Sequence, residues 1–228
     1  MGKIGKVKRG TGKKALSYDM KKRIVSIDYS GYDNRFAEET ACYRNDASVL
    51  FSLANSYWSA TIAIEEKLQR GFEEENIDLV AELIVPYLFE FRHFVELSIK
   101  ALYMAVTGEQ AKIEHDIKSL FPNMKEALLK LERDDRKGIF YITDEVFFDA
   151  KSNIEDYLNQ MEKIVMPYFK NEPAVEYYRF LFDTKNNLNS PEIDLDFDYQ
   201  KNLQKEYYIA YKKLIREIHR IHYIYDMR

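Results

Sequence analysis

Hydrophobic residues recur at steps of three and four along most of this chain, which is the spacing of one face of an α-helix. The clearest stripe predicts a last long helix over about residues 199–225, built on Leu203, Tyr207, Ala210, Leu214, Ile218, Ile221 and Tyr225. A comparable stripe predicts a first helix over about residues 46–70, built on Leu50, Leu53, Ala54, Trp58, Ile62 and Ala63. Asn45 or Asp46 is the expected cap of that first helix.

The most apolar segment predicts a second helix over about residues 77–106, which ends at Gly108. It is hydrophobic on most of its circumference, so we expect it at the centre of the fold. Pro86 should kink this helix or break it near Val85, because proline removes a backbone donor and clashes with the preceding turn.

Two shorter helices are predicted between the central and last ones. The first runs from His115-Asp116 to about residue 134, with Pro122 interrupting or restarting it, and the second follows a cap at Thr143 or Asp144 and ends near Val165. Additional short elements are expected over residues 135–198. The whole pattern predicts an all-α fold, a single helical bundle over residues 46–228.

Composition agrees with this picture. The 228 residues include 8 Gly and 5 Pro, against about 16 and 11 at average usage, which argues against a barrel or sandwich with many turns. Cys42 is the one cysteine, so neither an intrachain disulfide nor a cysteine zinc site can form. A lone cysteine is typical of a reducing compartment, and we expect a cytoplasmic protein.

Charge divides the chain into two regions. Residues 1–23 carry a net charge of +8 and the remainder −12. The bases of this tail are Lys3, Lys6, Lys8, Arg9, Lys13, Lys14, Lys21, Lys22 and Arg23. Residues 1–45 are therefore interpreted as a basic tail and irregular lead-in, briefly extended at residues 24–27, which either contacts phosphate or is a solvated leader.

Several common classes are not supported. The tail lacks the apolar run of a secretory signal, and the best membrane candidate, residues 81–106, carries five charged side chains. The chain has no glycine-rich phosphate loop, no Gly-x-Ser-x-Gly elbow and no His-Glu-x-x-His motif. We expect neither a membrane partner nor a resident cofactor.

A charged strip lies on the predicted central helix. Arg92, Glu96 and Lys100 are spaced i, i+4 and i+8, which places them on one side of a helix, with His93 beside them. His115 and Asp116 follow after a short linker, and Asp116 can cap the next helix while His115 reaches the strip. Two interpretations stay open: a buried ion-pair network that fixes packing, or a polar functional site.

The same segment resembles a known family. It contains Arg92-His93-x-x-Glu96-Leu97-x-x-Lys100-Ala101-Leu102, followed by His115-Asp116-Ile117-x-x-Leu120. This is similar to the helix motif and His-Asp element of the HEPN superfamily and its abortive-infection (AbiV-like) relatives. A later element, Tyr178-Arg179-Phe180-Leu181-Phe182-Asp183, is also similar, although Leu181 replaces the proline of the family pattern.

The resemblance implies a helical bundle, often a homodimer, in toxin–antitoxin or anti-phage systems. Many members are metal-independent endoribonucleases with an Arg, four to six residues, then His on a helix; others only bind. Arg216 and His222 match that spacing here. In the family chemistry His222 would be the acid/base and Arg216 would stabilise charge at phosphorus. RNA, a second copy, and an antitoxin or phage protein are the implied partners.

Alternatives remain at this end of the chain. Arg216 and His222 also suit a solvated basic helix end. His219 and His222 could share a metal ion, but Asp226 is the one further ligand in view, so we expect no metal site. The tyrosines are expected mainly in the core, with base stacking by Tyr207, Tyr208 or Tyr211 as the less supported option. A non-catalytic interaction module and a phage-triggered effector are the competing functions.

Overall fold

The computed structural model describes residues 5–7, 15–19, 24–28, 45–111, 115–131, 143–169 and 196–226. Side chains are described over residues 47–111, 115–131, 143–169 and 196–221. Most of the segment predicted to hold additional short elements, including Tyr178–Asp183, lies outside the described residues.

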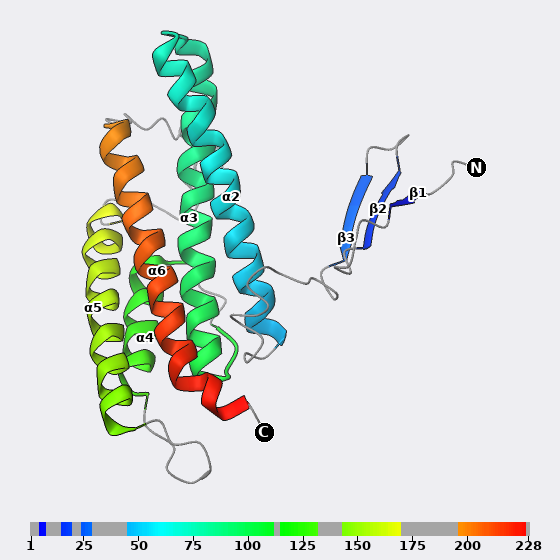
Figure 1. Ribbon diagram of the computed structural model, residues 1–228. Helices are drawn as coiled ribbons and strands as arrows, with labels where there is room; N and C mark the ends of the chain where they lie inside the picture. Colours follow the sequence, from blue (N-terminus) through cyan, green and yellow to red (C-terminus); the bar gives the residue numbers. More distant parts are fainter. Residues whose placement is uncertain are drawn as a thin grey trace, which may run out of the picture.

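Five helices of the described chain pack into one bundle (Figure 1). They are α2 (Asn45–Glu73), α3 (Ile77–Thr107), α4 (Ile117–Leu129), α5 (Asp144–Tyr168) and α6 (Phe197–Asp226). Helices α2 and α3 form a long hairpin, α4 packs between α3 and α5, and α6 lies along α5 and α3. The predicted all-α bundle is confirmed. None of the described helices is apolar over a length that could cross a bilayer.

Capping residues define where helices begin and end. The Asn76 side chain accepts a hydrogen bond from the Leu79 amide at the start of α3, and Gly108 ends α3 with φ of 69°. That left-handed conformation is easily reached only by glycine. Thr143, rather than Asp144, caps α5 by accepting from the Val146 amide.

Three prolines lie inside described helices, and the two that were expected to interrupt one, Pro86 and Pro122, do not. Helix α3 continues through Pro86 and α4 continues through Pro122, so the expected break near Val85 and the interruption of α4 are wrong. Both rings are exposed, so the carbonyl groups that each proline leaves without a donor can be hydrated. Helix α4 ends at Leu129, before the expected boundary near residue 134. Helix α5 continues through Pro167 to Tyr168, past the expected end near Val165.

Aromatic side chains from three helices form the centre of the core. The Phe94 ring of α3 lies 5.3 Å from Trp58 of α2 and 5.7 and 5.4 Å from Tyr207 and Tyr211 of α6. Trp58 also stacks on Tyr208, with ring centroids 4.4 Å apart. The position of α3 between α2 and α6 follows from its broad apolar surface, as the sequence predicts.

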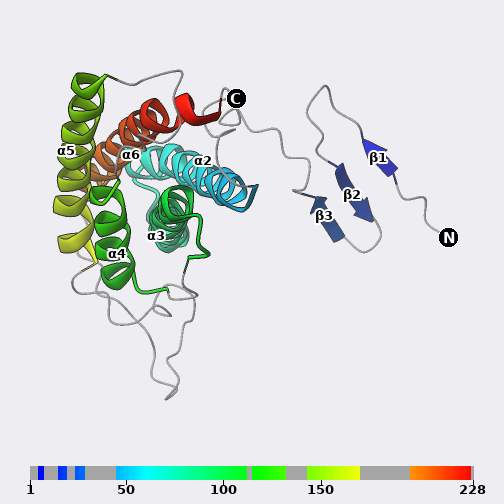
Figure 2. The ribbon, with the colours of Figure 1, turned by 90° about the horizontal axis from the view of Figure 1, so that it is seen from below.

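The N-terminal region contributes a small antiparallel sheet of order β1-β2-β3. Its strands are β1 (Gly5–Val7), β2 (Ala15–Asp19) and β3 (Ile24–Asp28). The register pairs Lys6 with Ser17 and Ser17 with Ser26. Figures 1 and 2 show the sheet outside the helical bundle. Strand β3 contains the extended segment predicted at residues 24–27, whereas the other two strands were not predicted.

Candidate functional site

A buried ion-pair network lies on one side of α3. Arg92 Nη1 donates to Glu96 Oε2 at 2.9 Å, and Lys100 Nζ donates to Glu96 Oε1 at 2.8 Å. Arg92 is 1% exposed and Glu96 4% exposed. The i, i+4, i+8 spacing accounts for this geometry, because residues four apart lie one above the other on a helix.

His115 joins the network to the start of α4. Its Nδ1–H donates to Glu96 Oε1 at 2.8 Å, and its backbone carbonyl accepts from Arg92 Nη2, also at 2.8 Å. Asp116 stays outside the network: its exposed side chain caps α4 by accepting from the Lys118 amide and the Ser119 hydroxyl. Four of the six residues predicted in this cluster are therefore brought together.

The environment keeps Glu96 ionised. Burial alone would raise the pKa of its carboxyl group, but the hydrogen bonds from Lys100 and His115, with the positive charges of Lys100 and Arg92, lower that pKa below its ordinary value. An ionised Glu96 has both oxygens engaged by donors. Such a carboxylate is a poor proton acceptor for a substrate and a strong structural partner.

His93 lies on a different side of α3, contrary to our expectation. Its ring stacks on Tyr57 of α2 at 5.1 Å and lies 4.2 Å from the Phe89 ring, and its Nδ1–H donates to the Phe89 carbonyl at 3.2 Å. One residue corresponds to a rotation of about 100° on a helix. That rotation directs His93 toward α2 while Arg92 is directed toward α4.

The second candidate pair lies on α6. One uninterrupted helix carries both Arg216 and His222, so six residues place them about 9 Å apart along the axis and about 120° apart around it. Arg216 is exposed and has no ion-pair partner among the described residues. The side chain of His222 lies outside the described residues.

Arg216 belongs to a basic stripe, which we define as the exposed residues Lys213, Arg216 and Arg220 on one face of α6. Arg220 differs from Arg216, because its guanidinium contacts Asp149 at 3.2 Å and Glu217 at 2.8 Å. Of the two arginines in the stripe, Arg216 is the one whose guanidinium has no ion-pair partner among the described residues, so an anion could bind there.

The three tyrosines considered for base stacking belong to the core. Tyr207 and Tyr211 are fully buried, and the Tyr208 ring is covered by Trp58. Their helical spacing on the apolar stripe of α6 explains why they face the other helices. Tyr207 and Tyr211 cannot stack on a nucleobase without opening the bundle, whereas Tyr208 is half-buried and has one ring face occupied by Trp58.

A further polar cluster was missed by the sequence analysis. Glu65 of α2 is buried and pairs with Lys205 of α6 at 3.0 Å. Nearby, the hydroxyl of Tyr87 and the amide of Gln204 are buried and have no hydrogen-bond partner among the residues that the structure describes. Burial, and then the charge of Glu65, raises the pKa of Tyr87 above its ordinary value. No sequence spacing reveals this cluster, because its members come from three different helices.

Across the described side chains, no group of three His, Cys, Asp or Glu is arranged to hold a metal ion. The side chains of His222 and Asp226, from the weaker metal candidate, lie outside that search. Comparisons with protein-family models, with curated proteins and with solved structures found no match for this chain.

Proposed function

We propose that this protein is a HEPN-like endoribonuclease of a toxin–antitoxin or anti-phage system, acting on RNA in the cytoplasm as a homodimer and without a metal. The proposal assigns the acid/base role to His222 and the stabilisation of negative charge to Arg216. It rests on the family resemblance of the central motif and on the geometry of α6.

The observation that carries the proposal is the state of Arg216. An exposed guanidinium without a carboxylate partner among the described residues keeps its donors for an external anion, and its fork matches a phosphate group. The neighbouring Lys213 and Arg220 add positive charge on the same face of α6. A phosphodiester backbone is the natural ligand of such a stripe.

The separation of about 120° between Arg216 and His222 explains why the proposal includes a second copy. Within one protomer, helix geometry places the two positions on different sides of α6, whereas two antiparallel copies of this helix can bring position 216 of one beside position 222 of the other. His222 would then take the proton of a 2′-hydroxyl, and Arg216 would bind the phosphate oxygens as charge develops.

The direct test is incubation of the purified protein with total cellular RNA in the presence of EDTA. The expected result is a set of discrete cleavage products that is unchanged by EDTA. Absence of cleavage, or cleavage that EDTA abolishes, would overturn the proposal.

A second candidate, a non-catalytic interaction module, is favoured by the end of the α2–α3 hairpin. Figure 1 shows this turn projecting beyond the other helices. Ile77, at the start of α3, is 79% exposed, and Phe72, at the end of α2, is also exposed. An intact protein that binds a partner through this end and does not cleave RNA would support this alternative.

A further inference from the structure

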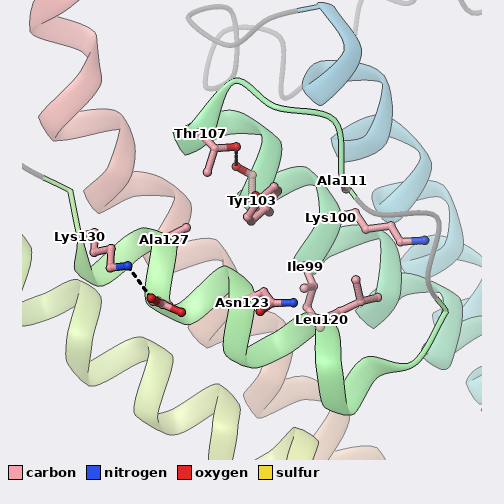
Figure 3. A pocket seen from close by; sticks show the side chains of 10 residues that line it. Ile99, Lys100, Tyr103, Thr107, Ala111, Leu120, Asn123, Ala127 and Lys130 are labelled. Atoms are coloured by element: carbon pink, nitrogen blue, oxygen red, sulfur yellow. Dashed lines mark hydrogen bonds and ion pairs between the residues drawn. The ribbon is translucent and has the colours of Figure 1, made fainter.

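A cavity of about 370 Å³ lies between the C-terminal half of α3 and α4. Figure 3 shows the side chains that line it. Its apolar lining comes from Ile99, Ala111, Leu120 and Ala127, together with the Tyr103 side chain. This volume is within the range of about 300–1,000 Å³ that is typical of small-molecule sites. The other five of the ten lining residues are polar or charged.

The charged residues of the lining favour an anion. They are Lys100, Lys130 and Glu126, which leaves a formal charge of +1. Lys130 pairs with Glu126, so these two charges cancel each other. Lys100 pairs with Glu96, which does not line the cavity.

Lys100 and Lys130 differ in how strongly each can attract a bound anion. The Lys130 side chain is 72% exposed, so water screens its charge, whereas the Lys100 side chain is 11% exposed. Electrostatic attraction is stronger where water is excluded. An ammonium group has three N–H donors, and among the described residues Glu96 is the one acceptor that Lys100 contacts.

The amide of Asn123 provides a second polar group. Asn123 lines the cavity, and its side chain has no hydrogen-bond partner among the described residues. In Figure 3 the Asn123 amide lies beside Ile99 and Leu120, while Lys100 and Lys130 lie at opposite ends of the lining. A ligand there would meet apolar side chains, the Asn123 amide, the Thr107 side chain, the exposed Glu126–Lys130 pair and the poorly hydrated ammonium group of Lys100.

We propose that this cavity binds a small organic anion with an apolar body, whose anionic group lies at Lys100 and whose body lies against Ile99, Leu120 and Ala127. The site is separate from Arg216 and His222, and it does not depend on the ribonuclease activity proposed above. Because Lys100 also holds Glu96, the bound anion would share a lysine with the network that joins α3 to α4.

The experiment is a fluorescence titration of the full-length protein with 1-anilinonaphthalene-8-sulfonate, an apolar dye with one anionic group. N-phenyl-1-naphthylamine, which lacks the sulfonate, is the neutral comparison. The expected result is saturable binding of one anionic dye per chain, about tenfold or more tighter than the neutral dye, as for a hydrogen bond to a charged group.

Three variants locate the dye. Lys100→Met should lower the affinity for the anionic dye about tenfold and leave the affinity for the neutral dye unchanged. Ala127→Phe should lower the affinity for both dyes about tenfold or more, because it fills the cavity and leaves the residues of the ion-pair network unchanged. Lys130→Met, which removes a screened and already paired charge, should change the affinity for the anionic dye less than about threefold.

Circular dichroism of each variant establishes that it is folded before titration. Equal affinity for the two dyes would overturn the proposal, because Lys100 would then contribute no selectivity for charge. Anionic-dye binding that survives Ala127→Phe would also overturn it, because the dye would then lie elsewhere. If Lys100→Met does not fold, the Ala127→Phe titration and the comparison of the two dyes still decide the question.

Discussion

Ser98 of α3 and Tyr207 of α6 share a buried hydrogen bond of 2.8 Å between their side-chain oxygens, although 109 residues separate them in the chain. The Ser98 hydroxyl donates its proton to the Val95 carbonyl at 2.8 Å, so Tyr207 is the donor to Ser98. Burial raises the pKa of Tyr207, and the bond to Ser98 offsets that effect in part. Tyr87 is equally buried, but within the described part of the chain its hydroxyl has no hydrogen-bond partner.

These two tyrosines give the first prediction. Tyr207→Phe should lower the free energy of unfolding by about 0.5–1.5 kcal/mol, since it removes a buried hydrogen bond. Tyr87→Phe should leave that free energy unchanged or raise it, since it removes a buried hydroxyl to which no described residue is hydrogen-bonded. Urea denaturation of both variants measures the difference. Equal losses in the two variants would contradict the assigned hydrogen bonding.

The second prediction concerns the ion-pair network. Glu96→Ala should lower the free energy of unfolding by about 3–5 kcal/mol, because it leaves buried cations without their shared carboxylate. Glu126→Ala is a matched control, because Glu126 also pairs with a lysine four residues later but is exposed. The control should unfold at nearly the wild-type urea concentration. A Glu96→Ala variant as stable as the control would show that burial of the network contributes nothing.

The third prediction follows from the lowered pKa of Glu96. Because the folded protein holds this carboxyl deprotonated more strongly than the unfolded chain does, the unfolded state binds more protons as the pH falls. The contribution of Glu96 is therefore complete above its ordinary pKa of 4.5 and is lost as the pH falls below that value. Glu96→Gln lacks this titration.

Urea midpoints of the wild type and Glu96→Gln, measured between about pH 7 and pH 3, test this dependence. The gap in stability between the two proteins should be constant near neutral pH and should narrow in acid. Other carboxyl groups affect both proteins alike and cancel in the comparison. Parallel curves over the whole range would contradict the pKa assignment.

The fourth prediction separates the two arginines of the basic stripe. Arg216→Ala should lower the rate of RNA cleavage about 10²–10³-fold through lost charge stabilisation, and His222→Ala about 10²–10⁴-fold through lost proton transfer. Arg220→Ala should keep most of the activity, because Arg220 is held by Asp149 and Glu217. Single-turnover cleavage of one RNA measures all three. Similar losses of cleavage rate in the Arg216 and Arg220 variants would contradict a specific role for Arg216 and would indicate that only the total positive charge of α6 matters.

The fifth prediction concerns the basic tail. If residues 1–23 contact RNA phosphates, their deletion should weaken binding to single-stranded RNA. The slope of log affinity against log salt concentration should then fall by about 0.7 for each lost contact. Filter binding at several salt concentrations measures both quantities. An unchanged affinity and slope would leave the tail without a role in RNA binding.

The sequence by itself determined the helices and the charged strip, because both depend on local spacing. A stripe at steps of three and four must lie on one face of a helix, and Arg92, Glu96 and Lys100 must then lie in line. The Asp116 cap was predictable for the same reason, since a cap bonds to backbone groups two or three residues ahead. The sequence did not reveal that α3 and α4 continue through Pro86 and Pro122, because the exposure that lets water hydrate the carbonyl groups beside each proline is set by the fold.

Only the tertiary structure decided which distant residues meet. His93 and His115 were both candidates for the network. Local helix geometry places His93 about 100° around α3 from Arg92, whereas the tertiary structure brought His115 to Glu96. The Glu65–Lys205 pair, the Ser98–Tyr207 bond and the cavity beside Lys100 likewise depend on how whole helices are oriented. The physical reason is that a helix is specified by hydrogen bonds four residues apart, whereas its rotation against a neighbour is set by the packing of the entire core.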